Sequence, residues 1–303
     1  MTKEWLNKLP SVRGQYLLNE PMKKHTWLGV GGAAEVMFYP VDENDLQYFL
    51  SHKPQDISLF ILGGGSNLLV RDGGIKGITI KLQNKTFAQW RVENDLLICG
   101  AGLKNFELKK ILPQNHIGGL EFLCSIPGTI GGAFRSNAGC FGTELAQVLQ
   151  YAKVMNEQGE IFQVPVEQFH FAYRHSNFPP DWIILEAALK MTTKSAEEIA
   201  SQIAQNDEYR KTHQPQGIRT AGSTFKNPPQ QAAWKLIKES GAAEIVVGGA
   251  QMSCQHCNFL QVSDFATAED VETLGENIIN AVKQKTGIEL QWEIKRIGQR
   301  QKS

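Results

Sequence analysis

The stretch Phe60-Ile-Leu-Gly-Gly-Gly-Ser-Asn67 leads from a short apolar run directly into three successive glycines. The apolar run predicts a strand. The glycines expose backbone N–H groups that a phosphate could approach without hindrance from side chains, although a tight turn is the simpler interpretation of one such loop. The stretch is not a G-x-G-x-x-G fingerprint, because the final glycine position holds Leu68. A Rossmann fold is therefore not favoured.

A second glycine-rich stretch lies further along the chain. It reads Ser125-Ile-Pro-Gly-Thr-Ile-Gly-Gly-Ala133 and is followed by Asn137-Ala-Gly139. No Lys-Ser or Lys-Thr pair completes a P-loop. Because two such stretches occur in one region, two unrelated turns become a weaker explanation, and the pair could hold a long diphosphate cofactor from both sides.

The region around both stretches is rich in predicted strands. Short apolar or alternating runs between glycines predict strands at 35–39, 59–62, 75–82, 96–99 and 182–189. Helices are expected after Asp42, a plausible N-cap, and over 103–112, before Pro113. This pattern is typical of an α+β fold.

The pattern changes near Ser195, which has capping-box spacing to Glu198 and begins a predicted helix that runs through residue 210. We place a domain boundary there, between residues 1–194 and 195–303. Helices are then expected over 232–240 and 267–286, each ended by a glycine. The strict alternation of 288–294 predicts a half-buried final strand.

Composition limits the classes of partner. The 303 residues contain 31 basic and 31 acidic side chains, so no net charge attracts a nucleic acid or an anionic membrane. No run reaches the roughly 20 apolar residues that span a bilayer, and residues 1–10 lack the apolar stretch of a secretory signal. We expect a cytoplasmic monomer that binds neither nucleic acid nor membrane.

The cysteines do not predict a disulfide framework or a metal site. The chain has five, an odd number, which suits a reducing compartment. Cys254-Gln-His-Cys257 is a lone C-x-x-C, and His256 between the two cysteines cannot easily complete a tetrahedral zinc site with them. We expect no bound metal.

Three polar side chains are candidates for chemistry, each with a simpler structural explanation. Alternating aromatics at 169, 171 and 173 place Arg174 on the other face of an extended segment, where it could be a solvated arginine on an edge strand. Ser223 follows a glycine, but the G-x-S-x-G elbow is absent, so a plain polar loop is equally plausible. Glu293 reads as a surface carboxylate on the final strand.

The combination of these motifs resembles the UDP-N-acetylenolpyruvoylglucosamine reductase family, over nearly the whole chain from about residue 25 to 298. The two glycine stretches are similar to that family's FAD-binding signature within the vanillyl-alcohol-oxidase-like (PCMH-type) fold. The run from Gly222 to Phe225 and the ending Trp292-Glu-Ile-Lys-Arg-Ile-Gly298 resemble its other motifs. The chain after Ser223 is too short for a tyrosine-bearing lid, so it resembles the shorter subclass.

The resemblance implies an FAD-binding domain of two subdomains at 1–194, an α+β substrate domain at 195–303, and a set of site residues. The implied catalytic residues are Arg174, Ser223 and Glu293. The implied cofactor-binding residues are Gly63, Gly64, Gly65, Ser66, Asn67, Leu68, Ser125, Pro127, Gly128, Thr129, Gly131, Gly132, Ala133, Asn137 and Gly139. By position within the matched motifs, Lys226, Asn227 and Gln251 are expected to bind the nucleotide sugar.

The implied reaction is the reduction of UDP-N-acetylglucosamine enolpyruvate to UDP-N-acetylmuramate, with FAD as cofactor and NADPH as hydride donor, for peptidoglycan synthesis. Arg174 would meet charge developing on the substrate carboxylate together with Glu293, and Ser223 would deliver a proton to the neighbouring carbon. Two alternatives stay open. One is an FAD-dependent sugar or lactone oxidase of the same fold, and the other is a nucleotide-binding regulator without catalytic activity.

Overall fold

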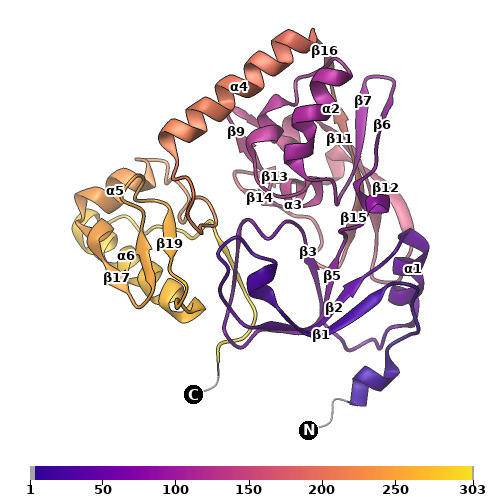
Figure 1. Cartoon of the computed structure of the whole chain (residues 1–303), viewed down its shortest axis with the longest axis horizontal. Coiled ribbons are helices and arrows are strands. Elements are labelled where there is room, and N and C mark those ends of the chain that lie inside the picture. Colours follow the sequence, from indigo (N-terminus) through magenta and orange to yellow (C-terminus); the bar gives the residue numbers. More distant parts are fainter. Residues whose placement is uncertain (1–3, 302–303) are drawn as a thin grey trace. The chain divides into compact units, whose positions relative to one another are not determined.

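The computed structural model describes residues 4–301, which form two compact units (Figure 1). Unit 1 comprises residues up to 18, 36–64 and 77–208, and unit 2 comprises 19–35, 65–76 and the residues from 209 on. The chain therefore passes between the units several times. One passage falls between Gly64 and Gly65, inside the first glycine stretch.

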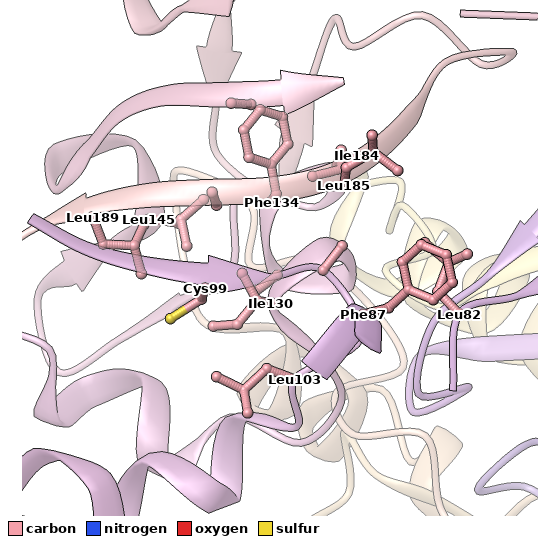
Figure 2. Packing of buried hydrophobic residues seen from close by; sticks show 14 of the residues in the cluster. Leu82, Phe87, Cys99, Leu103, Ile130, Phe134, Leu145, Ile184, Leu185 and Leu189 are labelled. Carbon is pink, nitrogen blue, oxygen red and sulfur yellow. The ribbon is translucent and has the colours of Figure 1, made fainter. Parts of the chain in front are cut away.

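The centre of unit 1 is a five-stranded antiparallel sheet. Its strands, in spatial order, are β12 (Ile161–Pro165), β11 (Leu149–Met155), β15 (Ile183–Lys190), β7 (Leu96–Gly100) and β6 (Trp90–Glu93). Helices α2 (Leu108–Gln114) and α3 (Ile130–Arg135) belong to the same unit. Figure 2 shows Phe134 of α3, Cys99 of β7 and Leu185 of β15 in one buried apolar cluster, which fixes α3 against the sheet.

A second sheet has the order β1-β2-β5-β3. Its strands are β1 (Gln15–Pro21), β2 (Ala33–Tyr39), β5 (Ile75–Lys81) and β3 (Leu59–Leu62), and β3 pairs with β5 in parallel. The predicted N-cap Asp42 begins α1 (Glu43–His52), since its carboxylate accepts a hydrogen bond from the Asp45 backbone N–H at 2.9 Å. Because β3 ends at Leu62, the three glycines of the first stretch directly follow the end of an outer strand of this sheet.

Short strands complete unit 1. They pair as β8 (Ile117–Gly118) with β16 (Thr192–Thr193), β9 (Gly139–Cys140) with β10 (Thr143–Glu144), and β13 (Phe171–Ala172) with β14 (His175–Ser176). Single 3-10 turns occur in both units, at Glu4–Lys8, Met22–Lys24, Lys85–Ala88, Asn105–Glu107, Glu121–Ser125, Leu145–Gln147, Val166–Gln168 and Ala242–Glu244.

Unit 2 packs two helices against small sheets around a second apolar cluster. Its helices are α5 (Ala233–Glu239) and α6 (Ala268–Thr286). One sheet has the order β17 (Val246–Val247), β18 (Ala250–Met252) and β19 (Leu260–Val262), and the other pairs β4 (Leu68–Val70) in parallel with β20 (Lys295–Ile297).

The sequence predicted the helix boundaries after residue 194 closely. The Ser195 and Glu198 capping box begins α4 (Ala196–His213), with reciprocal bonds of 3.2 and 2.9 Å. Thr267 caps α6, and Gly287 ends it with a left-handed φ of 75°. No helix in the described part of the chain is both long and apolar enough to cross a membrane.

Two predicted elements are wrong. The final strand is not 288–294 but β20, and within 288–294 the structure shows only an isolated bridge from Trp292 to Phe225. Alternation did mark burial, because Leu290 and Ile294 face the second cluster, but burial does not require a hydrogen-bonded neighbour strand. The helix predicted over 103–112 begins later, at Leu108, and continues through Pro113 to Gln114. Pro113 lacks the N–H that would bond the carbonyl four residues back, and the helix ends one residue after it.

Candidate active site

The two glycine stretches lie against each other within unit 1. A Cβ atom added to Gly64 would stand 2.6 Å from Cα of Gly128, and one added to Gly63 would stand 3.1 Å from Oγ1 of Thr129. Such distances leave no space for a side chain. The sequence requires glycine here because two backbones approach closely, and the approach leaves main-chain surface for a ligand.

The second stretch is fixed by the start of α3. Thr129 is the N-cap, and its Oγ1 accepts a hydrogen bond from Gly132 N at 3.3 Å. Gly131 N donates to Ala101 O at 2.9 Å, and a Cβ on Gly131 would stand only 3.0 Å from the Ala101 Cβ. Ala133 is buried in the apolar cluster. The stretch is therefore rigid where the sequence predicts cofactor contacts.

The rest of the first stretch belongs to unit 2. Gly65 has a left-handed φ of 65° and accepts a hydrogen bond from Trp27 N at 3.0 Å. Asn67 Nδ2 donates to the main-chain oxygen of Glu293 at 3.2 Å, and Leu68 pairs with Lys295. The glycine stretch and the motif of Glu293 thus meet in one unit.

Buried polar atoms near the stretches lack partners. Within residues 4–301, Ser125 Oγ, Asn105 Oδ1 and Asn67 Oδ1 are buried and accept or donate no hydrogen bond. Asn105 is otherwise held to the second stretch, with Nδ2 bonded to Ile126 O at 3.1 Å. Buried polar atoms normally have partners, so a ligand rich in polar atoms suits the second stretch of unit 1, where Ser125 and Asn105 lie. Asn105 is not a predicted site residue, since a single asparagine before a helix is typical of an ordinary cap.

Arg174 does not lie on a single edge strand as one interpretation expected. Strands β13 and β14 form a hairpin in which Phe171 pairs with Ser176, so Tyr173 and Arg174 form the turn. Arg174 has a left-handed φ of 54°, its Nη2 donates to Gly139 O at 2.8 Å, and its guanidinium lies 4.9 Å from the centre of the Tyr173 ring. The structure therefore brings Arg174 to the end of the second glycine stretch.

Ser223 and Glu293 come together within unit 2. Ser223 forms an isolated bridge with Phe259, and the next residue, Thr224, accepts a hydrogen bond from Glu293 N at 2.8 Å. Glu293 is half-buried, so it is not the plain surface carboxylate of the simpler interpretation. These two predicted catalytic residues thus belong to neighbouring extended segments.

The segment of Ser223 is bonded to Asn258, which is not among the site residues predicted from the sequence. Its side chain is buried, accepts from Phe225 N at 3.0 Å and donates to Phe225 O at 2.9 Å, while its own carbonyl accepts from Thr224 N at 2.7 Å. No periodic pattern marks such a residue. Only its place in the loop between β18 and β19 gives it this role.

The three predicted nucleotide-sugar contacts have different surroundings. Lys226 N donates to Gln291 O at 2.8 Å, and its side chain is half-buried. Asn227 Oδ1 accepts from Ala233 N at 3.0 Å, which caps α5. Gln251 lies exposed on β18. Lys226 and Gln251 thus have side chains that reach solvent, while the Asn227 amide also supports a helix.

An acidic side chain links α6 to the β4–β20 pair. Glu272 is 2% exposed and binds Arg71 through two hydrogen bonds of 2.9 Å, and Arg296 lies 3.4 Å away. Burial alone would raise the pKa of Glu272, but the hydrogen bond from Arg71 and the charges of Arg71, Arg296 and Arg300 lower it. This network fixes the strand that follows Glu293.

The cysteines are all free thiols. Burial raises the pKa of Cys99 and Cys124 to about 12, so both are inert. In the C-x-x-C segment, Cys257 Sγ lies 3.0 Å from Trp234 O, and His256 Nδ1 accepts from Asn258 N at 3.2 Å. Among the described residues, no three His, Cys, Asp or Glu side chains gather as they would around a metal ion.

Comparison with known proteins gives full-length matches. Residues 34–165 match the family profile described as FAD binding domain, and residues 214–297 match that of the UDP-N-acetylenolpyruvoylglucosamine reductase, C-terminal domain. The UDP-N-acetylenolpyruvoylglucosamine reductase of Bradyrhizobium sp. (strain ORS 278) is 42% identical over 290 residues, covering 96% of this chain and 94% of its own. That of Nitrobacter hamburgensis is 43% identical over 298 residues, covering 98% of each.

A solved structure agrees over nearly the whole fold. The crystal structure of UDP-N-acetylenolpyruvylglucosamine reductase from Thermus caldophilus superposes with a TM-score of 0.81 at 32% identity. The match covers 94% of this chain and 99% of that one. Both the glycine stretches and the segments of Ser223 and Glu293 therefore lie in a fold shared with this reductase.

Proposed function

Because the chain belongs to the UDP-N-acetylenolpyruvoylglucosamine reductase family, we propose that Arg174, Ser223 and Glu293 are the residues with which it carries out that reaction. The chain is a flavoprotein oxidoreductase that binds FAD, uses NADPH and acts in the synthesis of peptidoglycan precursors. Two observations support the proposal: Arg174 is bonded to Gly139 at the end of the second glycine stretch in unit 1, and within unit 2 the main chain of Glu293 is bonded to Asn67 and to Thr224, the neighbour of Ser223.

The residues of the two glycine stretches fit a bound FAD. Glycines at 63, 64 and 128 carry no side chain over their main-chain N–H groups, which a diphosphate would therefore be able to approach, and the buried Ser125 Oγ and Asn105 Oδ1, which lack partners, offer further polar contacts. When bound and reduced by NADPH, FAD supplies the hydride for the enolpyruvyl double bond. We therefore propose the residues of both glycine stretches, Ser66, Leu68 and Pro127 included, as the cofactor site. Asn137 would contribute to it through its main chain only, because both polar groups of its side chain are bonded within the protein.

Arg174 would stabilise the charge that develops on the substrate carboxylate. Its guanidinium is a planar cation with five N–H donors, and the bond to Gly139 O holds it in place before substrate arrives. A donor fixed in advance costs no reorganisation during the reaction. Lysine would be a poor replacement, because it offers a mobile point charge.

Ser223 and Glu293 would each have a separate role in the reaction. Ser223 would deliver the proton that completes the new C–H bond next to the carboxylate. Glu293, whose N–H donates to the carbonyl of Thr224 next to Ser223, would polarise the substrate carboxylate, as Arg174 would. Lys226, Asn227 and Gln251 are the proposed contacts to the nucleotide sugar.

Four further expectations accompany this proposal. The FAD domain would be 1–194 and the substrate domain 195–303, and the chain would belong to the shorter subclass of the family. The five free thiols support a cytoplasmic location. We also propose that the chain acts as a monomer, which light scattering of the purified holoprotein would test.

The function is tested by two half-reactions in the absence of oxygen. NADPH is expected to bleach the flavin absorbance near roughly 450 nm, and UDP-N-acetylglucosamine enolpyruvate is expected to restore it while UDP-N-acetylmuramate appears in the mass spectrum. Bleaching without reoxidation by this substrate would contradict the proposed reaction. Bleaching of the flavin by a sugar and not by NADPH, followed by rapid reoxidation once oxygen is admitted, would indicate the oxidase. Purified protein without flavin would indicate the regulator.

A further inference from the structure

Three hydrogen bonds attach the Arg174 hairpin to the segment that leaves α3. Ser176 Oγ donates to Arg135 O at 2.9 Å, Asn137 Nδ2 donates to Ala172 O at 3.1 Å, and Arg174 Nη2 donates to Gly139 O at 2.8 Å. The segment supplies every second residue from 135 to 139. The end of the second glycine stretch therefore supports the hairpin over its whole length.

Asn137 is the centre of this attachment. It is 0% exposed, has a left-handed φ of 43°, and its Oδ1 accepts from Ala146 N at 3.0 Å while Nδ2 binds Ala172 O. Both polar groups of the side chain are thus engaged within the protein. A side chain in this state supports main chain on two sides and does not reach out to a ligand.

Arg135 holds the end of the hairpin segment. Its Nη2 donates to the carbonyls of Pro179, Pro180 and Trp182 at 3.2, 3.3 and 2.9 Å, and its guanidinium lies 4.9 Å from the centre of the Phe178 ring. Burial lowers the pKa of Arg135. A guanidinium bound to three carbonyls fixes the chain where it returns from the hairpin to β15.

The turn itself needs such support. A non-glycine residue in the left-handed region costs roughly 1 kcal/mol or more and persists only where its surroundings determine it. Arg174 adopts this conformation at the turn of a hairpin whose strands have two residues each. The bonds between His170 and Asn177 and the packing of Phe171 on Phe134 hold the base of the hairpin, whereas the bonds from the 135–139 segment reach the turn itself.

We propose that Asn137, assisted by Arg135, is a positioning residue that holds Arg174 in place for the reaction. This inference rests on the proposed catalytic role of Arg174. It gives Asn137 a role through its side chain that differs from direct contact with the cofactor. The glycine stretch that carries the cofactor site would thereby also set the position of the guanidinium, so that one rigid segment aligns both.

The test compares Asn137→Gly with Asn84→Gly. Glycine adopts a positive φ without strain, so the first change removes only the side chain. Asn84, which has a φ of −87°, controls for the loss of an amide side chain that bonds main chain, because its Nδ2 donates to Pro40 O at 2.7 Å and its Oδ1 accepts from Thr86 N at 3.0 Å, far along the chain from the hairpin. Asn137→Asp, which keeps the acceptor and loses the donor, serves if the glycine variant does not fold.

For Asn137→Gly we expect reoxidation of the reduced holoenzyme by substrate to slow about tenfold, as small misplacements of a catalytic group do. Flavin content and the rate of reduction by NADPH should stay within about twofold, and hydrogen exchange at 171–176 should speed up. In an Arg174→Lys background the same change should have no further effect on reoxidation. Asn84→Gly should leave both half-reactions unchanged.

Two results would overturn the inference alone. The first is loss of flavin, or equal slowing of both half-reactions, in Asn137→Gly, which would show a cofactor or general structural role. The second is a double variant whose reoxidation is slowed by the product of the two single-variant factors, which would show that Asn137 does not act through Arg174. If Arg174→Lys alone reoxidises at the wild-type rate, the catalytic role of Arg174 fails first. The single and double variants therefore separate failure of the inference from failure of the function.

Discussion

The two regions that hold the proposed catalytic residues are built in opposite ways. Arg174 lies in a strained two-residue turn, and side chains from the second glycine stretch hold it. Ser223 and Glu293 lie on extended segments whose main chains bind each other through Thr224. Side-chain support makes the first region sensitive to single substitutions in function, whereas main-chain support makes the second sensitive mainly in stability.

The largest expected effect tests the first region. We expect Arg174→Ala and Arg174→Gly both to slow reoxidation by substrate about 100-fold to 1000-fold, as loss of one preorganised donor does. The glycine variant should be more stable than the alanine variant by about 1 kcal/mol, because glycine alone avoids the strain of the positive φ. Stopped-flow absorbance and urea unfolding measure the two quantities. Equal stability of the two variants would show that the turn is not strained.

The next effect tests the second region through Glu272. Glu272→Gln leaves Arg71 and Arg296 without their buried partner, so we expect a loss of about 3 kcal/mol in the free energy of unfolding near neutral pH. Arg91, whose partners Glu93 and Glu186 are more exposed, provides a control, since Arg91→Gln should cost about 1 kcal/mol or less. A neutral Glu272→Gln would show that main-chain pairing alone fixes β20.

The same carboxylate predicts a pH dependence. Because the folded state lowers the pKa of Glu272, its contribution is complete above the unfolded value of about 4.3 and is lost as pH falls through the folded value. The stability difference between the wild type and Glu272→Gln should therefore shrink as pH falls below about 4.3. Urea titrations at a series of pH values measure it, and a constant difference would contradict the assignment.

The smallest effect distinguishes the two regions most sharply. Asn258→Ala removes two hydrogen bonds to Phe225 and should cost about 2 kcal/mol of stability. Reoxidation should slow less than about threefold, because the bond from Glu293 N to Thr224 O remains. Asn137→Gly should show the reverse balance. A large loss of turnover in Asn258→Ala at full folding would remove the contrast between the regions.

The local features of the fold could be predicted from the sequence. Thr267 and Gly287 marked the ends of α6, and β3 matched its apolar run at 59–62, because caps and short apolar runs act through neighbouring residues. The two glycine stretches could be picked out from the sequence for a similar reason, and their residues stay the proposed cofactor site. A Cβ on Gly64 would collide with Gly128, and glycine is the one residue that tolerates this approach.

What the sequence did not predict depends on contacts between distant residues. Asn258, Arg135 and Glu272 act on partners 33, 47 and 201 positions away. No periodic pattern encodes such distances. The segment 288–294 shows the same limit. Its alternation predicts burial correctly, but the residues that form a strand are 295–297, because these are the ones that pair with β4.

The proposed chemistry is tested most directly by Ser223→Ala against Ser253→Ala. Ser253 is the control, because it is a buried serine of the same unit, whereas Ser223 is half-buried. The Ser253 Oγ accepts a hydrogen bond from Gln255 N at 3.3 Å. We expect both variants to bind flavin and to be bleached by NADPH as the wild type is. Ser223→Ala alone should lose reoxidation by UDP-N-acetylglucosamine enolpyruvate by about 100-fold or more. Reoxidation of Ser223→Ala at the rate of Ser253→Ala, with UDP-N-acetylmuramate formed, would contradict the account.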